Sequence, residues 1–286
     1  MSAPPRVRIG ELSRRTGVSI DVLRVWERRY GVLAPERTQG GQRLYSVADE
    51  QRIRAMQTHL ASGAPAGEAA RLVTQSGGQA ASARELGEPL VAALDALDEA
   101  GAHTALDRAF AELGVETALT DVVMPYLREL GDRWARAEVT PADEHFASRL
   151  LQARLLGAAR GWEAGAGPRA LLACPPGEEH DLGLISYGIA LGRLGWRITF
   201  LGASTPIGAI QEMADEIRID VVVLAATTPV RFANVIEPIR ELARDVPVAL
   251  AGAGANARLA TEAGAQLLDG DPVAAAAATA GAVAGA

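Results

Sequence analysis

A glutamate and a histidine lie in one short segment of the chain at a spacing that suits metal binding. Glu178 comes two residues before His180, and Gly183 follows three residues after it. A neutral imidazole binds transition metals well, and a nearby carboxylate can accept the other ring N–H, which fixes the tautomer and strengthens the donor nitrogen. We therefore interpret His180 as a candidate metal ligand and Glu178 as its partner, with an ordinary loop histidine as the alternative.

Short apolar runs that alternate with helical stretches surround this segment. They predict a doubly wound α/β domain over residues 168–286, with a Rossmann-like sheet of five parallel strands. The expected strands are residues 169–175, 197–202, 220–227, 246–252 and 266–269. Ligands bind such sheets beyond the carboxyl ends of the strands. We therefore expect the loops with His180, Thr227 and Gly252 to lie close together and to form a slot lined by small residues.

The region before the sheet has the pattern of a small helical bundle. Leu86, Leu90 and Leu94 repeat at helical spacing, and further amphipathic segments cover 103–113, 115–136 and 141–162. Four such helices predict a four-helix bundle over residues 83–164. Pro125 interrupts the third helix, so a kink is expected there. The small and polar segment 75–82 is the best candidate for a flexible linker before the bundle.

Residues 1–76 predict a winged helix-turn-helix domain. A short helix that ends near Gly17 is followed by a second helix, which Ser19 can cap and whose apolar residues repeat at three-to-four spacing. Arg24 and Arg28 share one face of that second helix. After it come two short extended arms around a Gly-Gly turn, a candidate wing that carries Arg37, Arg43 and Tyr45. Ser46 then has the pattern of a capping box that starts another helix.

The charge distribution supports a nucleic-acid contact at the N-terminal end only. The formal net charge of the 286 residues is −7, yet residues 1–60 hold 11 arginines against 6 acidic residues. A basic patch within an acidic protein favours binding of duplex DNA by that patch. No run of about 18 apolar residues and no secretion signal is present, so we expect no membrane segment and a cytoplasmic protein. The single cysteine, Cys174, fits a reducing compartment.

The N-terminal motifs resemble those of the MerR family of transcription regulators. The resemblance lies in Ile9-Gly-Glu-Leu-Ser-Arg-Arg-Thr-Gly-Val18 and in Leu23-Arg-Val-Trp-Glu-Arg-Arg-Tyr-Gly31, followed by Arg37-Thr-Gln-Gly-Gly-Gln-Arg-Leu-Tyr45. It implies that Arg24 and Arg28 enter or flank the major groove of double-stranded operator DNA, while Arg37, Arg43 and Tyr45 place the wing on the backbone. One such module buries little surface, so a homo-oligomer, a dimer or a tetramer, is expected on repeated half-sites.

The remaining motifs resemble the cobalamin-binding branch of that family, which includes CarA, CarH and LitR. Its members share the Glu-x-His-x-x-Gly segment and a Trp that precedes a Glu-His pair by nine residues, here Trp134 and Glu144-His145. The resemblance implies adenosylcobalamin as cofactor, with His180 as the cobalt ligand below. Trp134, Glu144 and His145 would face the adenosyl group above.

Four further residues complete the cofactor site that the resemblance implies: Glu178, Gly183, Thr227 and Gly252. The branch also has a Ser-x-Leu segment and a Gly-Gly pair, and this chain keeps both only in part. Thr227 or Thr228 is expected to supply the missing hydroxyl. These departures concern the contacts to the nucleotide tail more than the fold.

One departure bears on the signal. Light-sensing members of the branch carry a histidine directly after the tryptophan, which becomes a cobalt ligand after illumination, whereas this chain has Ala135, which has no donor atom. The leading hypothesis is a non-enzymatic repressor that responds to adenosylcobalamin and to light. A light-independent regulator that responds to cobalamin or to a protein partner is the alternative. A corrinoid-dependent methyl carrier is a third reading, disfavoured by the N-terminal module.

Overall fold

A computed structural model describes residues 6–38, 40–164 and 166–284 and divides the chain into two compact units, Met1–Arg84 and Glu85–Ala286. The first unit contains the basic N-terminal segment. The second contains both the predicted bundle and the predicted sheet. Each unit has its own hydrophobic core, and each is described here by itself.

Unit 1 begins with the helix-turn-helix that the sequence predicts. Helix α1 (Ile9–Thr16) ends at Gly17 in the left-handed conformation, and α2 (Ile20–Tyr30) begins at Ser19, whose side chain accepts a hydrogen bond from the backbone N–H of Val22. Strands β1 (Glu36–Arg37) and β2 (Arg43–Leu44) pair antiparallel and form the wing. Ser46 and Asp49 form the predicted capping box at the start of α3 (Val47–Ala61).

The expected linker 75–82 is helical instead. Helix α4 (Ala66–Asp95) runs through it without interruption, and the boundary between the two units falls inside this helix, between Arg84 and Glu85. Gly77 and Gly78 each weaken a helix by about 1 kcal/mol relative to alanine. The alanine-rich sequence on both sides favours the helix, and the early part of α4 is anchored because Ala69, Ala70 and Val73 belong to the buried core of unit 1.

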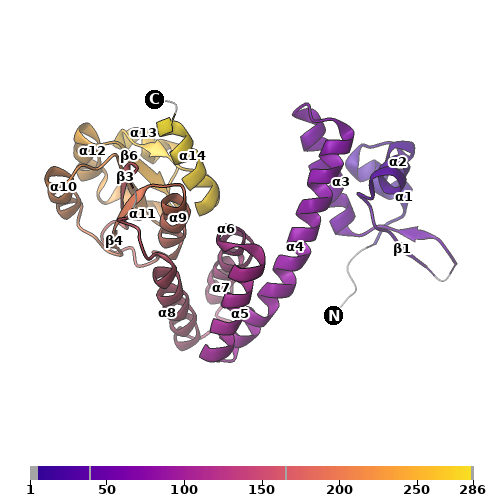
Figure 1. Ribbon diagram of the computed structural model, residues 1–286, viewed down its shortest axis with the longest axis horizontal. Coiled ribbons are helices and arrows are strands. Elements are labelled where there is room, and N and C mark those ends of the chain that lie inside the picture. The colour runs from indigo at the N-terminus through magenta and orange to yellow at the C-terminus, as the bar shows by residue number, and fades with distance from the viewer. Residues whose placement is uncertain (1–5, 39, 165, 285–286) are drawn as a thin grey trace. The chain divides into compact units, whose positions relative to one another are not determined.

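The bundle in unit 2 has four helical segments, as predicted (Figure 1). They are the end of α4, then α5 (Glu99–Leu113), the continuous series α6 (Val115–Ala118), η1 (Leu119–Val123) and α7 (Met124–Ala135), and finally α8 (Pro141–Ala158). The interruption expected near Pro125 is a π-helical turn, in which the Met124 N–H bonds to the Leu119 carbonyl. Proline has no N–H to donate to the carbonyl four residues earlier, and the wider turn precedes it.

A five-stranded parallel sheet follows the bundle, in the spatial order β4-β3-β5-β6-β7. The strands are β3 (Arg169–Ala173), β4 (Arg197–Gly202), β5 (Val221–Ala225), β6 (Val248–Ala251) and β7 (Gln266–Leu267), so the predicted ranges extended up to two residues too far at some ends. All four neighbouring pairs are parallel. The prediction of a doubly wound sheet is therefore confirmed.

Helices cover both faces of this sheet (Figure 1). One face packs its core against α9 (Leu182–Arg193) and α14 (Pro272–Ala284), and the other against α10 (Ile207–Glu216), α12 (Ile236–Asp245) and α13 (Ala257–Ala263). The short α11 (Pro229–Ala233) follows β5. Strand β3 lies between β4 and β5, so the chain leaves it where the strand order reverses, and a ligand site is expected there. No helix among the described residues is long and apolar enough to cross a lipid bilayer.

Candidate functional site

Glu178 occupies the centre of the loop between β3 and α9. Its oxygen Oε1 accepts hydrogen bonds from Nδ1 of His180 at 2.6 Å and from the backbone N–H of His180 at 3.0 Å. Oxygen Oε2 accepts from the backbone N–H of Thr227 at 2.7 Å and from the hydroxyl of Thr227 at 2.8 Å. Burial by itself would raise the pKa of Glu178, but these donors outweigh it and lower the pKa to about 2. The carboxyl group is therefore ionised at neutral pH and can only accept hydrogen bonds.

His180 is oriented by that carboxylate. Because an ionised Glu178 can only accept, Nδ1 of His180 carries the hydrogen, and in the neutral ring Nε2 has the lone pair. The side chain of His180 is 70% exposed, whereas that of Glu178 is 1% exposed. A buried carboxylate thus holds an exposed imidazole with its second nitrogen uncommitted. This donor set fits a transition-metal ion bound through a single histidine, as the cobalt of a corrinoid would be.

Gly252 and Gly183, the two glycines predicted for the site, have different roles in the structure. Gly252 has a φ of +84°, and a Cβ atom there would lie 2.5 Å from the carbonyl oxygen of Ala226, so only glycine lets the loops after β5 and β6 approach. Gly183 lies in the first turn of α9, where a Cβ would lie 3.9 Å from Cε of Met124 in the bundle. Gly252 thus shapes the sheet edge, and Gly183 marks where bundle and sheet meet.

Glu144 and His145 lie in the first turn of α8, which a Thr140–Asp143 capping box holds in place. Glu144 accepts from the hydroxyl of Ser148 at 2.6 Å, and its other oxygen lies 2.6 Å from Nδ1 of His145. Burial would raise the pKa of Glu144. The bonds from Ser148 and His145, together with the positive charges that His145 and His180 can carry, lower it instead. Glu144 is therefore ionised at neutral pH.

The face of α8 that carries Glu144 also contacts the loop that carries His180. Glu144, Ser148 and Gln152 are spaced by four residues, so they form one stripe along the helix. The side-chain amide of Gln152 donates to both carboxylate oxygens of Asp181, at 2.9 Å each. Asp181 is 4% exposed and directly follows His180. The bundle is thus joined to the β3–α9 loop by a buried polar contact.

Trp134 is not the packed core residue that it would be in a plain helical bundle. It lies at the end of α7 and is 46% exposed. The chain then turns through Ala137, which has a φ of +56° and whose N–H bonds to the Trp134 carbonyl, and α8 starts at Pro141. Ala135, the next residue, is exposed as well. The indole therefore offers a large apolar surface on the bundle.

The predicted DNA-reading helix presents a mixed face. Arg24 and Arg28 are exposed on α2, and Arg24 has only a long contact of 3.9 Å to Asp21. Val25 lies beside them on the helix surface and is 47% exposed, although valine is usually buried. Leu23 and Trp26 occupy the opposite, buried face. The exposed face thus combines guanidinium groups for phosphates or guanines with apolar groups that suit a groove floor.

The wing corrects one prediction, because Tyr45 is fully buried and does not present itself to DNA. It belongs to the core of unit 1, and its hydroxyl donates to Oε2 of Glu27 at 2.7 Å. Arg43 contacts the other oxygen of Glu27 at 2.8 Å. Burial, followed by the hydrogen bond to Glu27, raises the pKa of Tyr45. Glu27 thus ties the wing to α2, and Arg37 is left exposed on β1.

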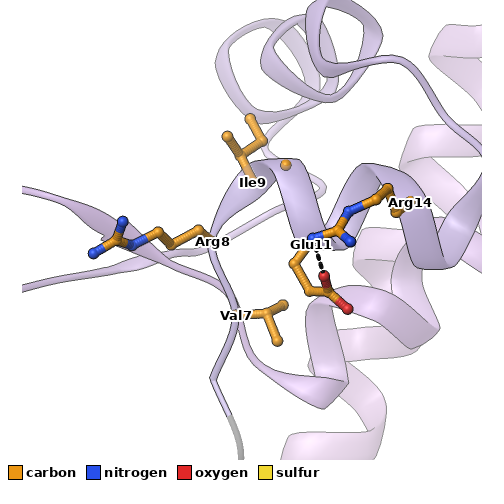
Figure 2. Close-up of a pocket in the computed structure, with 6 residues that line it drawn as sticks. Val7, Arg8, Ile9, Glu11 and Arg14 are labelled. Atoms are coloured by element: carbon orange, nitrogen blue, oxygen red, sulfur yellow. Dashed lines mark ion pairs between the residues drawn. The ribbon is translucent and has the colours of Figure 1, made fainter.

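Unit 1 also has a shallow hollow at the start of α1 (Figure 2). It is lined by Val7, Arg8, Ile9, Gly10, Glu11 and Arg14. Its one carboxylate, Glu11, is paired with Arg14 at 2.5 Å and with Arg15 at 2.9 Å. Figure 2 shows Arg8 extending away from this pair. None of the residues predicted for DNA or cofactor binding lines this hollow.

Comparison with known families assigns the N-terminal domain and the helical bundle. The model of the MerR HTH family regulatory protein matches residues 7–76, and the model of the B12 binding domain matches residues 86–156. The chain is 37% identical over 260 residues to the HTH-type transcriptional repressor CarA of Myxococcus xanthus, covering 88% of each protein. It is 32% identical over 271 residues to the repressor CarH of the same organism, covering 88% of this chain and 91% of CarH.

The chain belongs to the MerR family of transcription regulators. Within that family it falls in the group with a B12 binding domain. Relatives that match almost its whole length are transcriptional repressors and not enzymes. This MerR-family protein also shares the fold of the monomethylamine corrinoid protein of Methanosarcina barkeri, with a TM-score of 0.60 and 17% identity over 70% of this chain and 99% of that one.

Sequence reasoning missed several residues of this MerR-family site. Gln152 and Ser148 follow Glu144 at intervals of four on a predicted helix, so the spacing could have indicated them. Asp181 follows His180 directly, but its bundle partner is 29 residues away in the sequence and left no local pattern. The sequence left open whether Thr227 or Thr228 contributes a hydroxyl to the nucleotide-tail slot. The structure directs the hydroxyl of Thr227 to Glu178 instead.

Proposed function

We propose that this MerR-family protein is a repressor whose operator binding is controlled by adenosylcobalamin held between the bundle and the sheet. The observation that carries the proposal is the exposed imidazole of His180, which the buried Glu178 orients so that Nε2 is free. Gln152, on the same face of α8 as Glu144, donates to Asp181, the residue after His180, so this face of the bundle lies beside the histidine loop. This contact supports a single site that the loop and the bundle form together.

In this proposal each side chain has a distinct part. His180 would hold cobalt through Nε2, while Glu178, to which Thr227 donates, keeps the ring in one orientation. Trp134, Glu144 and His145 would contact the adenosyl group, which suits the exposed indole of Trp134. When bound, the cofactor supplies a cobalt–carbon bond that visible light can break. Loss of the adenosyl group would remove the surface against which Trp134 packs.

DNA binding follows from assembly in the proposed mechanism. Arg24, Arg28, Arg37 and Arg43 contact operator DNA from each copy of the winged domain. Two or more copies are needed to bury enough surface for tight binding, so a dimer or tetramer is the operator-binding form. The cofactor can shift this assembly only because it binds the assembled and dissociated forms with different affinity. Adenosylcobalamin would favour the assembled form, and light would favour its dissociation.

Ala135 supports a second candidate function in which light is not the natural signal. The side chain of Ala135 has no donor atom, so it could not coordinate cobalt after illumination. The regulator would then respond to the abundance of cobalamin or to a protein partner. Operator binding that depends on cobalamin but is identical in darkness and in light would select this version.

A methyl-carrier function is less well supported. The chain shares the corrinoid-protein fold, but its relatives over nearly the whole length are repressors. Detection of methyl transfer from the loaded protein to a thiol acceptor would be needed to adopt it.

One experiment tests cofactor, ligand residue and signal together. The full chain is loaded with adenosylcobalamin in darkness, and its absorption spectrum and its size by chromatography are recorded before and after green light. Wild type should retain the corrinoid with a histidine-ligated spectrum and should change size on illumination. His180→Ala should retain it weakly or show the spectrum without histidine ligation.

The matched control is His59→Ala, because His59 lies on α3 of unit 1 and is not among the residues proposed to hold the cofactor. It should behave as wild type. Retention of corrinoid with an unchanged spectrum in His180→Ala would overturn the proposed coordination. A single unchanged chromatographic peak in darkness and light would overturn the light response while leaving cofactor binding intact.

A further inference from the structure

Arg231 of α11 lies against the loop that presents the cobalt ligand. Its Nη1 atom is 2.5 Å from the position that a Cβ of Gly177 would occupy, and Gly177 directly precedes Glu178. Gly177 has a φ of +77°, and its backbone N–H donates to Oγ of Ser204 at 3.0 Å, which holds the loop in place. The absence of a side chain at Gly177 therefore makes room for the guanidinium.

The charge of Arg231 is not neutralised within the described residues. No carboxylate among residues 6–38, 40–164 and 166–284 forms an ion pair with it, whereas Arg169, Arg240 and Arg258 of the same domain each pair with a glutamate. The carboxylate of Glu178 in the same loop is already used by four hydrogen bonds. Arg231 is half-buried, so its guanidinium is an uncommitted cation at the edge of the site.

A half-buried guanidinium without an ion-pair partner can bind an oxyanion. Its planar fork of N–H groups matches the oxygens of a phosphate and binds them more strongly than it binds a neutral group. A complete cobalamin carries one such anion outside the corrin ring, the phosphodiester of its nucleotide tail. Thr227, which contacts Glu178, lies in the loop after β5, and Arg231 follows it four residues later in α11.

We infer that Arg231 binds the phosphodiester of the nucleotide tail and so makes the site selective for complete cobalamins over corrinoids that lack the tail. This inference rests on the proposed function and goes beyond it, because it assigns a specificity residue outside the Glu178–His180 pair. Gly177 serves the same purpose indirectly, since any side chain there would displace the guanidinium.

The test compares two corrinoids on two proteins. Adenosylcobalamin has the phosphodiester and the base, while adenosylcobinamide lacks both, and each is titrated in darkness by absorption into the full-length wild type and into Arg231→Gln. Wild type should bind adenosylcobalamin at least about 10-fold more tightly than adenosylcobinamide. Arg231→Gln should lose most of that ratio and bind adenosylcobinamide as wild type does. Arg231→Lys should recover part of the ratio, because it restores the charge without the fork.

A third probe separates the phosphate from the base. Adenosylcobinamide phosphate keeps a phosphate and lacks the nucleoside, so its advantage over adenosylcobinamide should also depend on Arg231. The control variant is Arg258→Gln, whose guanidinium pairs with Glu262 on α13 and should not alter the ratio.

The outcomes distinguish a failure of the proposed function from a failure of the role of Arg231. If neither corrinoid binds wild type, the proposed function fails and the role of Arg231 fails with it. If both bind and Arg231→Gln leaves the ratio unchanged, only the role of Arg231 is overturned.

Discussion

The side-chain amide of Gln152 donates to both oxygens of the Asp181 carboxylate, at 2.9 Å each. Gln152 belongs to the bundle, and Asp181 directly follows His180 in the sheet domain. Asp181 is 4% exposed, and the amide of Gln152 is its side-chain partner among the described residues. Any displacement of α8 from the sheet would therefore leave a buried carboxylate without this partner. Bundle position and the conformation of the histidine loop are coupled through this contact.

Gln152→Leu should destabilise unit 2, because it leaves the carboxylate of Asp181 buried and unbonded. The expected loss in the free energy of unfolding is about 1–3 kcal/mol, measured by urea unfolding of the cofactor-free chain. Hydrogen exchange in peptides around residues 175–185 should accelerate. Gln211→Leu is the control, since Gln211 bonds the exposed Asp215 at 3.1 Å and its loss should cost little. Equal effects of the two substitutions would contradict the coupling.

Thr227→Val should weaken corrinoid binding, because Glu178 loses the hydroxyl donor and His180 is then held less firmly. Loss of a partner that orients a metal ligand typically costs about 10-fold in affinity or more. The measurement is the dissociation constant for adenosylcobalamin from an absorption titration in darkness. Thr227→Ser should restore binding, since it keeps the hydroxyl. Thr261→Val is the control and should leave the affinity unchanged, because the hydroxyl of Thr261 bonds the Ala257 carbonyl of its own helix α13.

Gly252→Ala should be strongly destabilising. A Cβ at this position would lie 2.5 Å from the Ala226 carbonyl oxygen, and the φ of +84° is one that alanine rarely adopts. The expected loss is at least about 2 kcal/mol, combining steric and backbone strain. Gly208→Ala in α10 is the matched control, because no atom lies within 4 Å of its Cβ position and alanine favours a helix. It should leave stability unchanged or raise it slightly, as judged by thermal unfolding.

The architecture was largely predictable because it depends on local patterns. Apolar runs of strand length alternate with helical periodicity after Pro168, and a parallel sheet is the arrangement that such alternation favours. Gly17, Ser19 and Ser46 likewise marked helix ends through their own backbone and side-chain preferences. The sequence did not indicate that α4 is helical through residues 75–82, because Gly77 and Gly78 disfavour a helix locally. Packing of the preceding segment in the core of unit 1 stabilises the helix nevertheless.

The site was predictable only as far as its ligand motif extends. Glu178 and His180 are two residues apart, so their hydrogen bond could be inferred from chemistry. The contacts of Thr227 and Gln152 join segments 49 and 29 residues apart, and no local pattern encodes them. Tyr45 was taken for a DNA contact because it ends a basic motif. Its side chain instead fills the core of unit 1, since Glu27 offers a partner for its hydroxyl inside the fold.

Asp49 should make the stability of unit 1 sensitive to acid. Burial by itself would raise its pKa, but hydrogen bonds from the backbone N–H groups of Ala34 and Ser46 and from Arg52 outweigh burial and lower the pKa below its ordinary value of 3.8. The folded state therefore binds this proton less readily than the unfolded state. The stabilisation is fully present above about pH 4 and is lost as the pH falls through the lower folded pKa.

Asp49→Asn provides the comparison. Near pH 6 the variant should be less stable than wild type by about 1 kcal/mol, and near pH 3 the gap should shrink. Urea unfolding followed by pulsed hydrogen exchange of peptides from α2 and α3 reports on unit 1 alone. A gap that stays constant or widens on acidification would show that the charge of Asp49 does not stabilise the fold.

Arg37 and Tyr45, the first and last residues of the predicted wing motif, should behave differently toward DNA. Arg37 is exposed on β1, so Arg37→Ala should weaken binding to a generic duplex and reduce the slope of log affinity against log salt by about 1, the effect of losing one phosphate contact. Tyr45→Phe should leave that slope unchanged, because the side chain is buried, and should instead lower the stability of unit 1 by about 1 kcal/mol through loss of its bond to Glu27. Fluorescence anisotropy across a salt series measures the slopes. A reduced slope for Tyr45→Phe at unchanged stability would return Tyr45 to the DNA interface.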